Sequence, residues 1–592
     1  MSIYNPPVQE ILFILTELAG IDDVAALPGF EDATPDMVAA IVEEAGKLAS
    51  NVIAPINRIG DQQGSKLSDG KVSTPDGWQQ AYNTFCENGW NGLSFDPEFG
   101  GQGLPHLLAT VVDDLMNAGS VAFTLCPMLT HGAMNTIHAH ASDALKQIYL
   151  EKMVSGEWTG TMNLTEPQAG SDLSAIKTRA VAEGDHYLIT GQKIFITYGD
   201  HDLTENIIHL VLARLPDAPT GVKGISLFIV PKMLVDANGS VGEANDVQCV
   251  SLEHKLGIHG SPTAVMSFGD NGGATGYLVG NEHEGLRYMF TMMNLARLAV
   301  GVEGIAISER AYQQAREYAL ERVQSTPLGG KPGDGSTIIK HPDIRRMLMT
   351  MKSQIEASRS VAYLCSAAHD HAHNNPDEEV RVSNRKLNDL LTPIVKGWST
   401  ELANELTSLN LQIHGGMGYI EETGAAQHYR DARITAIYEG TTGIQANDLL
   451  WRKLVHDKGA VMFDFITTMK ELENNLTNQG LDRICTALMT GIDCLENASK
   501  WLLEQPDPRK SAAGSVPYLR LAGTVIGGWQ MARAALAAKA KLNTDDTGSD
   551  FYNSKIITSE FYASNIMPQA TSLLAVITQG SDDVLALDDE QF

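Results

Sequence analysis

The sequence lacks the cysteine spacing that would indicate a disulfide framework or a zinc site. Its six cysteines are widely scattered, and none forms a Cys-x-x-Cys pair. This scatter favours a reducing compartment in which the cysteines are small buried hydrophobic residues. Basic residues are also scarce, because 43 Lys and Arg stand against 72 Asp and Glu for a formal net charge of −29. Such a surface repels nucleic-acid phosphates and disfavours anionic membranes.

Targeting and membrane-spanning signals are missing as well. The first basic side chain is Lys47, so the sequence has neither the positive start of a secretory signal nor an Arg-rich transit peptide. The apolar run Ile11–Leu15 is far too short to span a bilayer. We therefore expect a cytoplasmic protein with no membrane span and no nucleic-acid partner.

The pattern along the 592 residues predicts an α+β protein with four parts. Residues 1–157 have apolar residues at helical spacing and predict an N-terminal helical domain. Residues 158–280 hold short β-rich segments between turn residues and predict an antiparallel β-domain or barrel. Residues 281–456 return to long helical periodicity, which predicts a helical bundle. Residues 457–592 predict a further helical extension.

Individual elements can be predicted in the first two parts. A helix is expected after Pro6-Pro7, and a second one around Pro35–Ile53. Turns are expected at Gly184-Asp185 and at Gly191-Gln192. The predicted strands are Tyr187–Thr190, Lys193–Thr197, Ile207–Arg214, Ile225–Val230 and Thr263–Phe268.

The most informative segment is Ala436–Gln445, AIYEGTTGIQ. Thr442 and Gln445 fit a capping box, so we expect a helix to begin there. Glu439 lies just ahead of that start and is followed by Gly440, so its carboxylate can project from an elbow into a cavity. On this segment alone, the commoner interpretation is a surface glutamate favoured by a helix N-terminus.

Five segments together resemble elements of the acyl-CoA dehydrogenase family. They occur in the family's order, over roughly residues 30–455. The segments are NLTEPQAGSD (Asn163–Asp172), KIFITY (Lys193–Tyr198), EHKLGIHGSPT (Glu253–Thr263), QIHGGMGY (Gln412–Tyr419) and IYEGTTGIQ (Ile437–Gln445). The resemblance implies the family's fold, with an N-terminal helical domain, a middle β-barrel domain and a C-terminal helical bundle. It also implies FAD-dependent α,β-dehydrogenation of an acyl-CoA thioester to the trans-2-enoyl-CoA.

Glu439 matches the family's catalytic base. Its side chain would remove the proton next to the thioester carbonyl, and its backbone N–H would help to hold the thioester oxygen. Some family members carry the base at the position of Ala296, and alanine cannot accept a proton, which supports Glu439. Arg297 matches a residue that contacts CoA, although an ion-paired helix residue is the alternative. The substrate-binding residues implied by the resemblance are Ser171, Arg297, Tyr438 and Gly440.

The resemblance also implies the residues that contact FAD. Thr165 and Thr197 would hydrogen-bond the flavin ring, and Phe195 would form an aromatic wall where the family usually has Trp. The other expected contacts are Gly170, Ser171, Arg322, Gln412, Gly415, Gly416 and Thr441, of which the glycine turn would bind the adenosine half from a neighbouring subunit. A homo-oligomer, with a dimer expected, follows from these contacts. Tyr198 in place of Asn, and Gly443 in place of a frequent Gln, depart from the family pattern.

The long chain is similar to a subclass that includes 3-methylmercaptopropionyl-CoA dehydrogenases, which would place it in dimethylsulfoniopropionate degradation. Short- or medium-chain fatty acyl-CoA dehydrogenases are the alternative. An electron-transfer flavoprotein is the expected electron acceptor, whereas an oxidase would use oxygen and a silent acyl-CoA-binding protein would lack the base. His369, His371 and His373 have a spacing of two that suits no metal site, so the tract predicts a polar helix end before Pro376.

Overall fold

The computed structural model describes residues 3–331, 333, 335–543 and 548–592. Contacts within the chain divide it into two compact units. Unit 1 contains Met1–Glu44, Pro105–Asp114 and Val300–Phe592, and unit 2 contains Ala45–Leu104 and Leu115–Ala299. Helices α3 (Pro35–Leu48), α6 (His106–His140) and α8 (Gly285–Glu321) contribute residues to both units.

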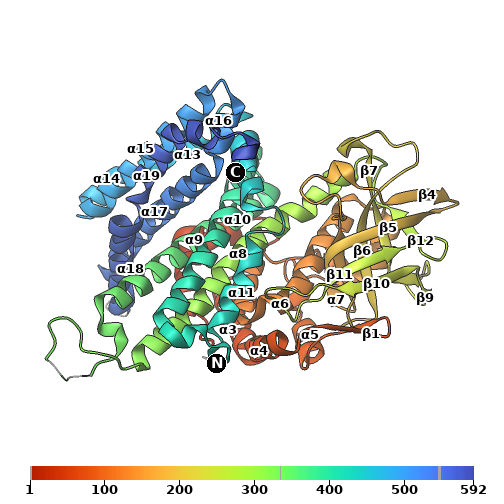
Figure 1. Ribbon diagram of the computed structural model, residues 1–592, viewed down its shortest axis with the longest axis horizontal. Coiled ribbons are helices and arrows are strands. Elements are labelled where there is room, and N and C mark those ends of the chain that lie inside the picture. Colours follow the sequence, from red (N-terminus) through yellow and green to blue (C-terminus); the bar gives the residue numbers. More distant parts are fainter. Residues whose placement is uncertain (1–2, 332, 334, 544–547) are drawn as a thin grey trace. The chain divides into compact units, whose positions relative to one another are not determined.

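Unit 2 is built on an eight-stranded sheet (Figure 1). Its strands follow the order β10-β11-β5-β12-β7-β6-β3, and β4 pairs with both β5 and β6, so the sheet is barrel-like. Its strands are β3 (Trp158–Asn163), β4 (Arg179–Glu183), β5 (His186–Thr197), β6 (Asn206–Arg214), β7 (Ile225–Pro231), β10 (Val247–Leu252), β11 (Thr263–Phe268) and β12 (Ala274–Leu278). Small hairpins add β1 (Lys66–Ser68) with β2 (Lys71–Ser73), and β8 (Met233–Val235) with β9 (Val241–Ala244). Helices α4 (Ala54–Gln63), α5 (Trp78–Glu87) and α7 (Asp143–Ser155) belong to the same unit.

Two hydrophobic clusters hold unit 2 together. The strand β6 alternates between them, because Leu210 and Leu212 pack in one cluster while Val211 packs in the other. Alternation with a period of two is what a strand buried on both faces produces. The first cluster also contains Trp158 at the start of β3, which is fully buried. This strand leads directly into the NLTEPQAGSD segment, so the core fixes where that segment leaves the sheet.

Unit 1 is helical. Helices α9 (Pro342–Asn374) and α10 (Glu378–His414) pack side by side, and α10 also contacts α11 (Ala425–Thr435) and α12 (Thr442–Asn447). The shorter helices at its N-terminal end are α1 (Val8–Ile14) and α2 (Ile21–Ala25). Helix α9 ends at Asn374 as the histidine tract predicted, and the rings of His369 and His373 lie 4.2 Å apart on it at an angle of 37°.

The C-terminal extension belongs to unit 1, and its helix α17 (Ser515–Leu542, blue in Figure 1) packs against both the bundle and the rest of the extension. Helix α17 contacts α9, α10 and α12 of the bundle as well as α15, α18 and α19 of the extension. Its side chains Leu519, Leu521, Val525 and Ile526 are buried to 2% exposure or less. The extension consists of α13 (Ala460–Lys470), α14 (Leu472–Asn478), α15 (Asp482–Glu504), α16 (Pro508–Ala513), α17 (Ser515–Leu542), α18 (Ser549–Phe561), α19 (Gln569–Gln579) and α20 (Ser581–Val584).

A buried ion cluster ties the extension to the N-terminal helix. Lys555 of α18 donates to Glu10 of α1 at 2.5 Å and to Glu356 of α9 at 2.7 Å. Lys352 forms a second ion pair with Glu356. The Lys555 side chain is 1% exposed, so its charge depends on these two carboxylates for compensation.

Tyr562 forms a buried hydrogen bond within the extension. Its hydroxyl donates to the Thr524 carbonyl at 2.9 Å, and the residue is completely buried. We expect Tyr562→Phe to lower the free energy of unfolding by about 1 kcal/mol, since one buried hydrogen bond is lost while the ring remains. Thermal unfolding of the variant measures this loss, and a midpoint equal to that of the parent would show that the contact contributes nothing.

The predictions of β6, β7 and β11 are confirmed, whereas β3, β4, β10 and β12 of the sheet were not predicted. Strand β11 has the predicted bounds, and Gly184-Asp185 forms the turn between β4 and β5. The turn predicted at Gly191-Gln192 is wrong, because β5 runs through it without a break. A Cβ atom at Gly191 would lie 2.5 Å from the Thr178 hydroxyl, so glycine permits close packing there. All six cysteines are free thiols, and all except the half-buried Cys86 are buried.

Helix α8 is, within the described residues, the one helix that is long and apolar enough to cross a membrane. However, 67% of its apolar window is buried inside the protein. Burial of that extent is typical of the core helix of a globular protein.

Candidate functional site

Glu439 lies on an elbow between α11 and α12. Its φ angle is +52° and that of Gly440 is +92°, so two consecutive residues adopt left-handed backbone conformations. A non-glycine residue in this region costs of order 1 kcal/mol or more and persists only where its surroundings enforce it. The side chain of Glu439 is half-buried. The elbow therefore defines the backbone position from which the Glu439 carboxylate extends.

Two side chains hold the carbonyl groups of the elbow. Lys396 of α10, which is fully buried, donates to the Gly440 carbonyl at 2.6 Å. Gln445 of α12 donates to the Glu439 carbonyl at 3.1 Å and to the Gly440 carbonyl at 3.3 Å. The Tyr438 hydroxyl, immediately before the base, is hydrogen-bonded to Glu303 of α8. Contacts from three helices thus fix the backbone on both sides of Glu439.

The predicted capping box is displaced by one residue. Thr441, not Thr442, is the N-cap of α12, and its hydroxyl accepts from the Ile444 N–H at 3.3 Å. The Thr442 hydroxyl instead donates to Glu401 at 2.5 Å. Gln445 is used to hold the elbow, so it cannot close the box. Helix α12 itself is short and continues as a π-helical segment, Asp448–Val455.

A second group of predicted residues lies in unit 1 at the end of α10. Gln412 is in its last turn, and Gly415 and Gly416 begin the short 3-10 helix Gly415–Tyr419. All three residues are exposed. Arg322 follows the end of α8 and is also exposed, and its backbone carbonyl accepts from the Ile338 N–H at 2.8 Å.

In unit 2, β3 and β5 carry the residues predicted to contact the flavin ring. The Thr165 carbonyl accepts from the Ile194 N–H at 2.9 Å, and the Thr197 carbonyl accepts from the Thr161 hydroxyl at 2.7 Å. The structure therefore brings the two segments together, although they are far apart in sequence. Phe195 has a φ angle of +59° and is 58% exposed at the end of β5. This strained backbone turns a large aromatic ring away from the core.

Glu166, next to Thr165, organises this region. Its carboxylate accepts from Lys193 at 2.8 Å and from the backbone N–H groups of Lys177 and Thr178 at 2.7 and 3.1 Å. Burial alone would raise the pKa of Glu166, but Lys193 and the hydrogen bonds from Thr178 and Lys177 lower it to about 2. Lys193 also donates to the Leu164 carbonyl at 3.1 Å. The pair thus fixes the backbone on both sides of Thr165.

The remaining predicted residues of unit 2 differ in exposure. Gly170 and Ser171 are exposed in the loop after β3, and no atom lies within 4 Å of the place where a Cβ of Gly170 would be. Arg297 of α8 is buried, with 5% of its surface exposed. Contact of Arg297 with CoA stays a prediction.

Four residues around the two groups were missed in the sequence. Glu166 and Lys193 lie inside the quoted TEP and KIF segments, where only their neighbours had been assigned roles. Lys396 and Glu303 each interrupt an apolar stretch, PIVKGW and AVGVEGIA. A charged residue within a buried helical face is the signal that could have revealed them, because such residues need a partner.

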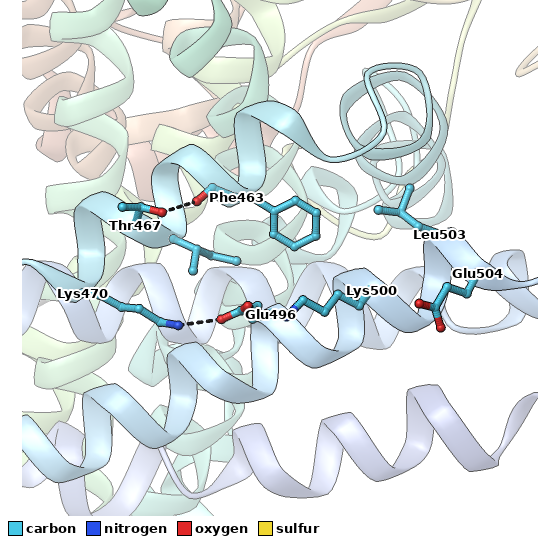
Figure 2. A pocket seen from close by; sticks show the side chains of 8 residues that line it. Phe463, Thr467, Lys470, Glu496, Lys500, Leu503 and Glu504 are labelled. Atoms are coloured by element: carbon cyan, nitrogen blue, oxygen red, sulfur yellow. Dashed lines mark hydrogen bonds and ion pairs between the residues drawn. The ribbon is translucent and has the colours of Figure 1, made fainter.

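Two surface grooves among the described residues are lined by other side chains. Figure 2 shows the residues of α13 and α15, Phe463 among them, that line one of these grooves, whose volume is about 330 Å³. Its rim is closed by ion pairs from Lys470 and Lys500 to Glu496, at 2.6 and 2.5 Å. In unit 2, the EHKLGIHGSPT segment lines a polar groove of about 250 Å³ beside Asp61, which pairs with His259 at 3.0 Å.

Comparison with protein families places this geometry in context. The chain matches the acyl-CoA dehydrogenase N-terminal domain over residues 36–157, the middle domain over 161–271 and the C-terminal domain over 283–454. The extension matches a family described as acetyl-CoA dehydrogenase C-terminal like, over residues 465–588.

Whole-length relatives are also found. The chain is 46% identical to 3-methylmercaptopropionyl-CoA dehydrogenase of Ruegeria pomeroyi, over 98% of this chain and 99% of the relative. It is 34% identical to a butyryl-CoA dehydrogenase of Syntrophomonas wolfei, over 100% of this chain and 99% of the relative. Among solved structures, an acyl-CoA dehydrogenase complexed with FAD from Bacillus anthracis shares the fold with a TM-score of 0.72 at 21% identity, covering 98% of this chain and 92% of the other.

Proposed function

Because this chain belongs to the acyl-CoA dehydrogenase family, we propose that it oxidises a short, sulfur-containing acyl-CoA, 3-methylmercaptopropionyl-CoA, with Glu439 as its base. The chain is an FAD-dependent oxidoreductase that dehydrogenates acyl-CoA thioesters. The left-handed elbow that presents Glu439 is the observation that carries the proposed chemistry. The 46% identity to a dehydrogenase of that name over nearly the whole length supports the proposed substrate.

The residues of each unit fit FAD. In unit 2, the exposed ring of Phe195 offers an aromatic surface to a flat ring system. Gly170 and Ser171 lie in an open loop whose backbone can approach a phosphate closely. In unit 1, Met417 and Tyr419 are 47% and 90% exposed beside Gly415 and Gly416, which suits the aromatic face of a base such as adenine. When bound, FAD accepts the hydride that leaves the β carbon of the substrate.

The other steps belong to the chain's own residues. Glu439 would take the α proton, and its backbone N–H would hold the thioester oxygen as negative charge develops there. Lys396 stabilises the elbow, because its ammonium group donates to the Gly440 carbonyl at 2.6 Å and keeps that carbonyl directed toward the bundle. Thr165 and Thr197 would fix the flavin, with Glu166 and Lys193 holding their loop.

The proposal extends to partners and place. We expect an electron-transfer flavoprotein to reoxidise the enzyme, a homodimer to complete the adenosine end of the FAD site, and a cytoplasmic location. With the proposed substrate, the enzyme would act in dimethylsulfoniopropionate degradation. The exposed glycine turn at Gly415–Tyr419 supports a contact with a second subunit, because its neighbouring side chains are apolar.

A comparison of acyl-CoA substrates tests the proposed specificity. The purified yellow protein is mixed anaerobically with 3-methylmercaptopropionyl-CoA, with pentanoyl-CoA, in which a methylene replaces the sulfur, and with butyryl-CoA. We expect the methylmercapto compound to bleach the flavin with a kcat/KM about tenfold above that of pentanoyl-CoA, which is the discrimination available to a shaped apolar pocket.

Equal values for the three substrates would instead indicate a general short-chain dehydrogenase. Repeating the reaction in air separates a dehydrogenase from an oxidase, because only an oxidase regains its yellow colour rapidly without an added electron acceptor. Failure of every acyl-CoA to bleach the flavin would overturn the proposed function itself.

A further inference from the structure

Glu303 is an acidic residue in an otherwise apolar part of α8. It is 1% exposed, and its Oε2 atom forms the hydrogen bond with Tyr438, the residue before the proposed base. Its Oε1 atom is buried and has no hydrogen-bond partner in the part of the chain that the structure describes. A carboxylate oxygen in that position would lose its hydration without compensation, which favours the neutral acid.

Two nearby negative charges also favour the neutral form of Glu303. The groups that face it are Tyr438, Lys396, Glu439 and Asp113. Burial raises the pKa of Glu303 to about 8, and the negative charges of Glu439 and Asp113 add to this effect against the opposing influence of Tyr438 and Lys396. Asp113 is itself held back from ionising, since burial and Asp114 raise its pKa to about 7.

We propose that Glu303 is a positioning residue for Glu439, acting as a buried neutral acid that fixes Tyr438 and thereby the conformation of the elbow. This inference rests on the proposed function, in which Glu439 is the base. Glu303 does not touch the reacting atoms in this proposal. It acts through one hydrogen bond and through the absence of a second negative charge beside the base.

The anchoring role follows from the strained backbone of the elbow. A left-handed conformation at Glu439 persists only while the residues on both sides are held. Lys396 and Gln445 hold the carbonyl groups that follow the α carbon of Glu439. Tyr438 is the anchor on the preceding side, and α8 supplies Glu303 as its partner. Release of that anchor would let the carboxylate drift, and a displacement of about 1 Å can cost up to a hundredfold in rate.

Three variants separate the effect of the Glu303–Tyr438 hydrogen bond from the effect of side-chain size. Tyr438→Phe and Glu303→Leu both remove the hydrogen bond, so we expect each to slow flavin reduction by acyl-CoA about tenfold. Glu303→Gln keeps a neutral acceptor of nearly the same shape, so its rate should stay within about threefold of the parental rate at neutral pH. If Glu303→Leu does not fold, the contrast between Tyr438→Phe and Glu303→Gln decides the question.

The pH profile supplies a readout that a purely structural role would not change. As the pH rises through about 8, Glu303 of the parent becomes negatively charged beside the base and the developing enolate. This charge opposes proton removal, so the parental rate of flavin reduction should fall on the alkaline side. Glu303→Gln cannot ionise, and its rate should stay level over that range. An alkaline fall that persists in Glu303→Gln would overturn the proposal, as would parental rates in both Tyr438→Phe and Glu303→Leu.

Two further proteins make the outcome unambiguous. Tyr562→Phe removes a chemically matched hydrogen bond of a buried tyrosine in the extension, and its rate of flavin reduction should equal that of the parent. Glu439→Gln tests the base itself. If Glu439→Gln is inactive while the Glu303 and Tyr438 variants behave as the parent, only this inference fails. If Glu439→Gln reduces the flavin at the parental rate, the proposed function fails with it.

Discussion

Replacement of Glu439 by glutamine is expected to leave FAD bound and to slow flavin reduction by acyl-CoA about 1,000-fold, within the range that a general base contributes. Glutamine has nearly the shape of glutamate, so the left-handed elbow and its contacts with Lys396 and Gln445 should persist. The backbone N–H that would bind the thioester oxygen is unchanged. Only the proton acceptor is lost, so the defect should lie in the reduction step and not in substrate binding.

Anaerobic rapid mixing of the variant with substrate measures this effect directly. The ratio of flavin to protein shows whether FAD is retained, and the dependence of the rate on substrate concentration separates binding from proton removal. Glu473→Gln makes the same chemical change on an exposed carboxylate of α14 and should be indistinguishable from the parent. A rapid bleaching of the Glu439→Gln flavin would show that another group is the base.

The second large effect is expected at the buried pair of Lys193 and Glu166. The two side chains are 0% and 3% exposed and 2.8 Å apart. Lys193→Met would leave the Glu166 carboxylate buried without its cation. We expect this change to lower the free energy of unfolding by about 4 kcal/mol. Because the pair holds the backbone around Thr165, we also expect the variant to retain less FAD than the parent.

Hydrogen exchange locates this effect within unit 2. Amides in residues 161–178 and 193–197 should exchange faster in Lys193→Met by a factor of about 1,000, the equivalent of about 4 kcal/mol of local stability. Lys152→Met breaks an exposed ion pair with Glu157 in the same unit, and we expect less than about 1 kcal/mol from it. Unchanged protection around Thr165 in Lys193→Met would contradict the assigned role of the pair.

The pH dependence of the same pair has a definite sign. The pKa of Glu166 is about 2 in the folded protein, against an ordinary value of 4.5. The unfolded chain therefore binds more protons between these two values, and the stability that Glu166 contributes is present above pH 4.5 and lost as the pH falls toward 2. The double variant Glu166→Gln, Lys193→Met should lack this part of the acid sensitivity.

Local pattern was sufficient to predict β6, β7, β11 and the elbow, but not β3, β4, β10 and β12. The bounds of β11 and the turn before β5 follow from alternation and from glycine, and the elbow from a short motif ahead of a helix start. The sequence does not predict which residues of other helices contact the elbow. Glu303 is 135 residues from Tyr438, and Lys396 is 44 residues from Gly440. Whether a charged residue in an apolar helical face finds such a partner is decided by packing, which local periodicity does not contain.

The capping box and the Gly191 turn failed for a related reason. In both cases a residue expected to form a local motif makes a different contact. Gln445 binds the carbonyls of the elbow, and Gly191 admits the side chain of Thr178. Motifs of two or three residues specify what a segment can do on its own, whereas its neighbours determine which of those options it adopts.

The anchoring of Lys555 limits how this enzyme can be shortened. A truncation after Val455 would delete Lys555 and leave Glu10 without the cation it now binds, whereas Glu356 would keep its ion pair with Lys352. A minimal version would therefore need Glu10 replaced by a neutral residue, together with polar substitutions on the faces that α17 now covers.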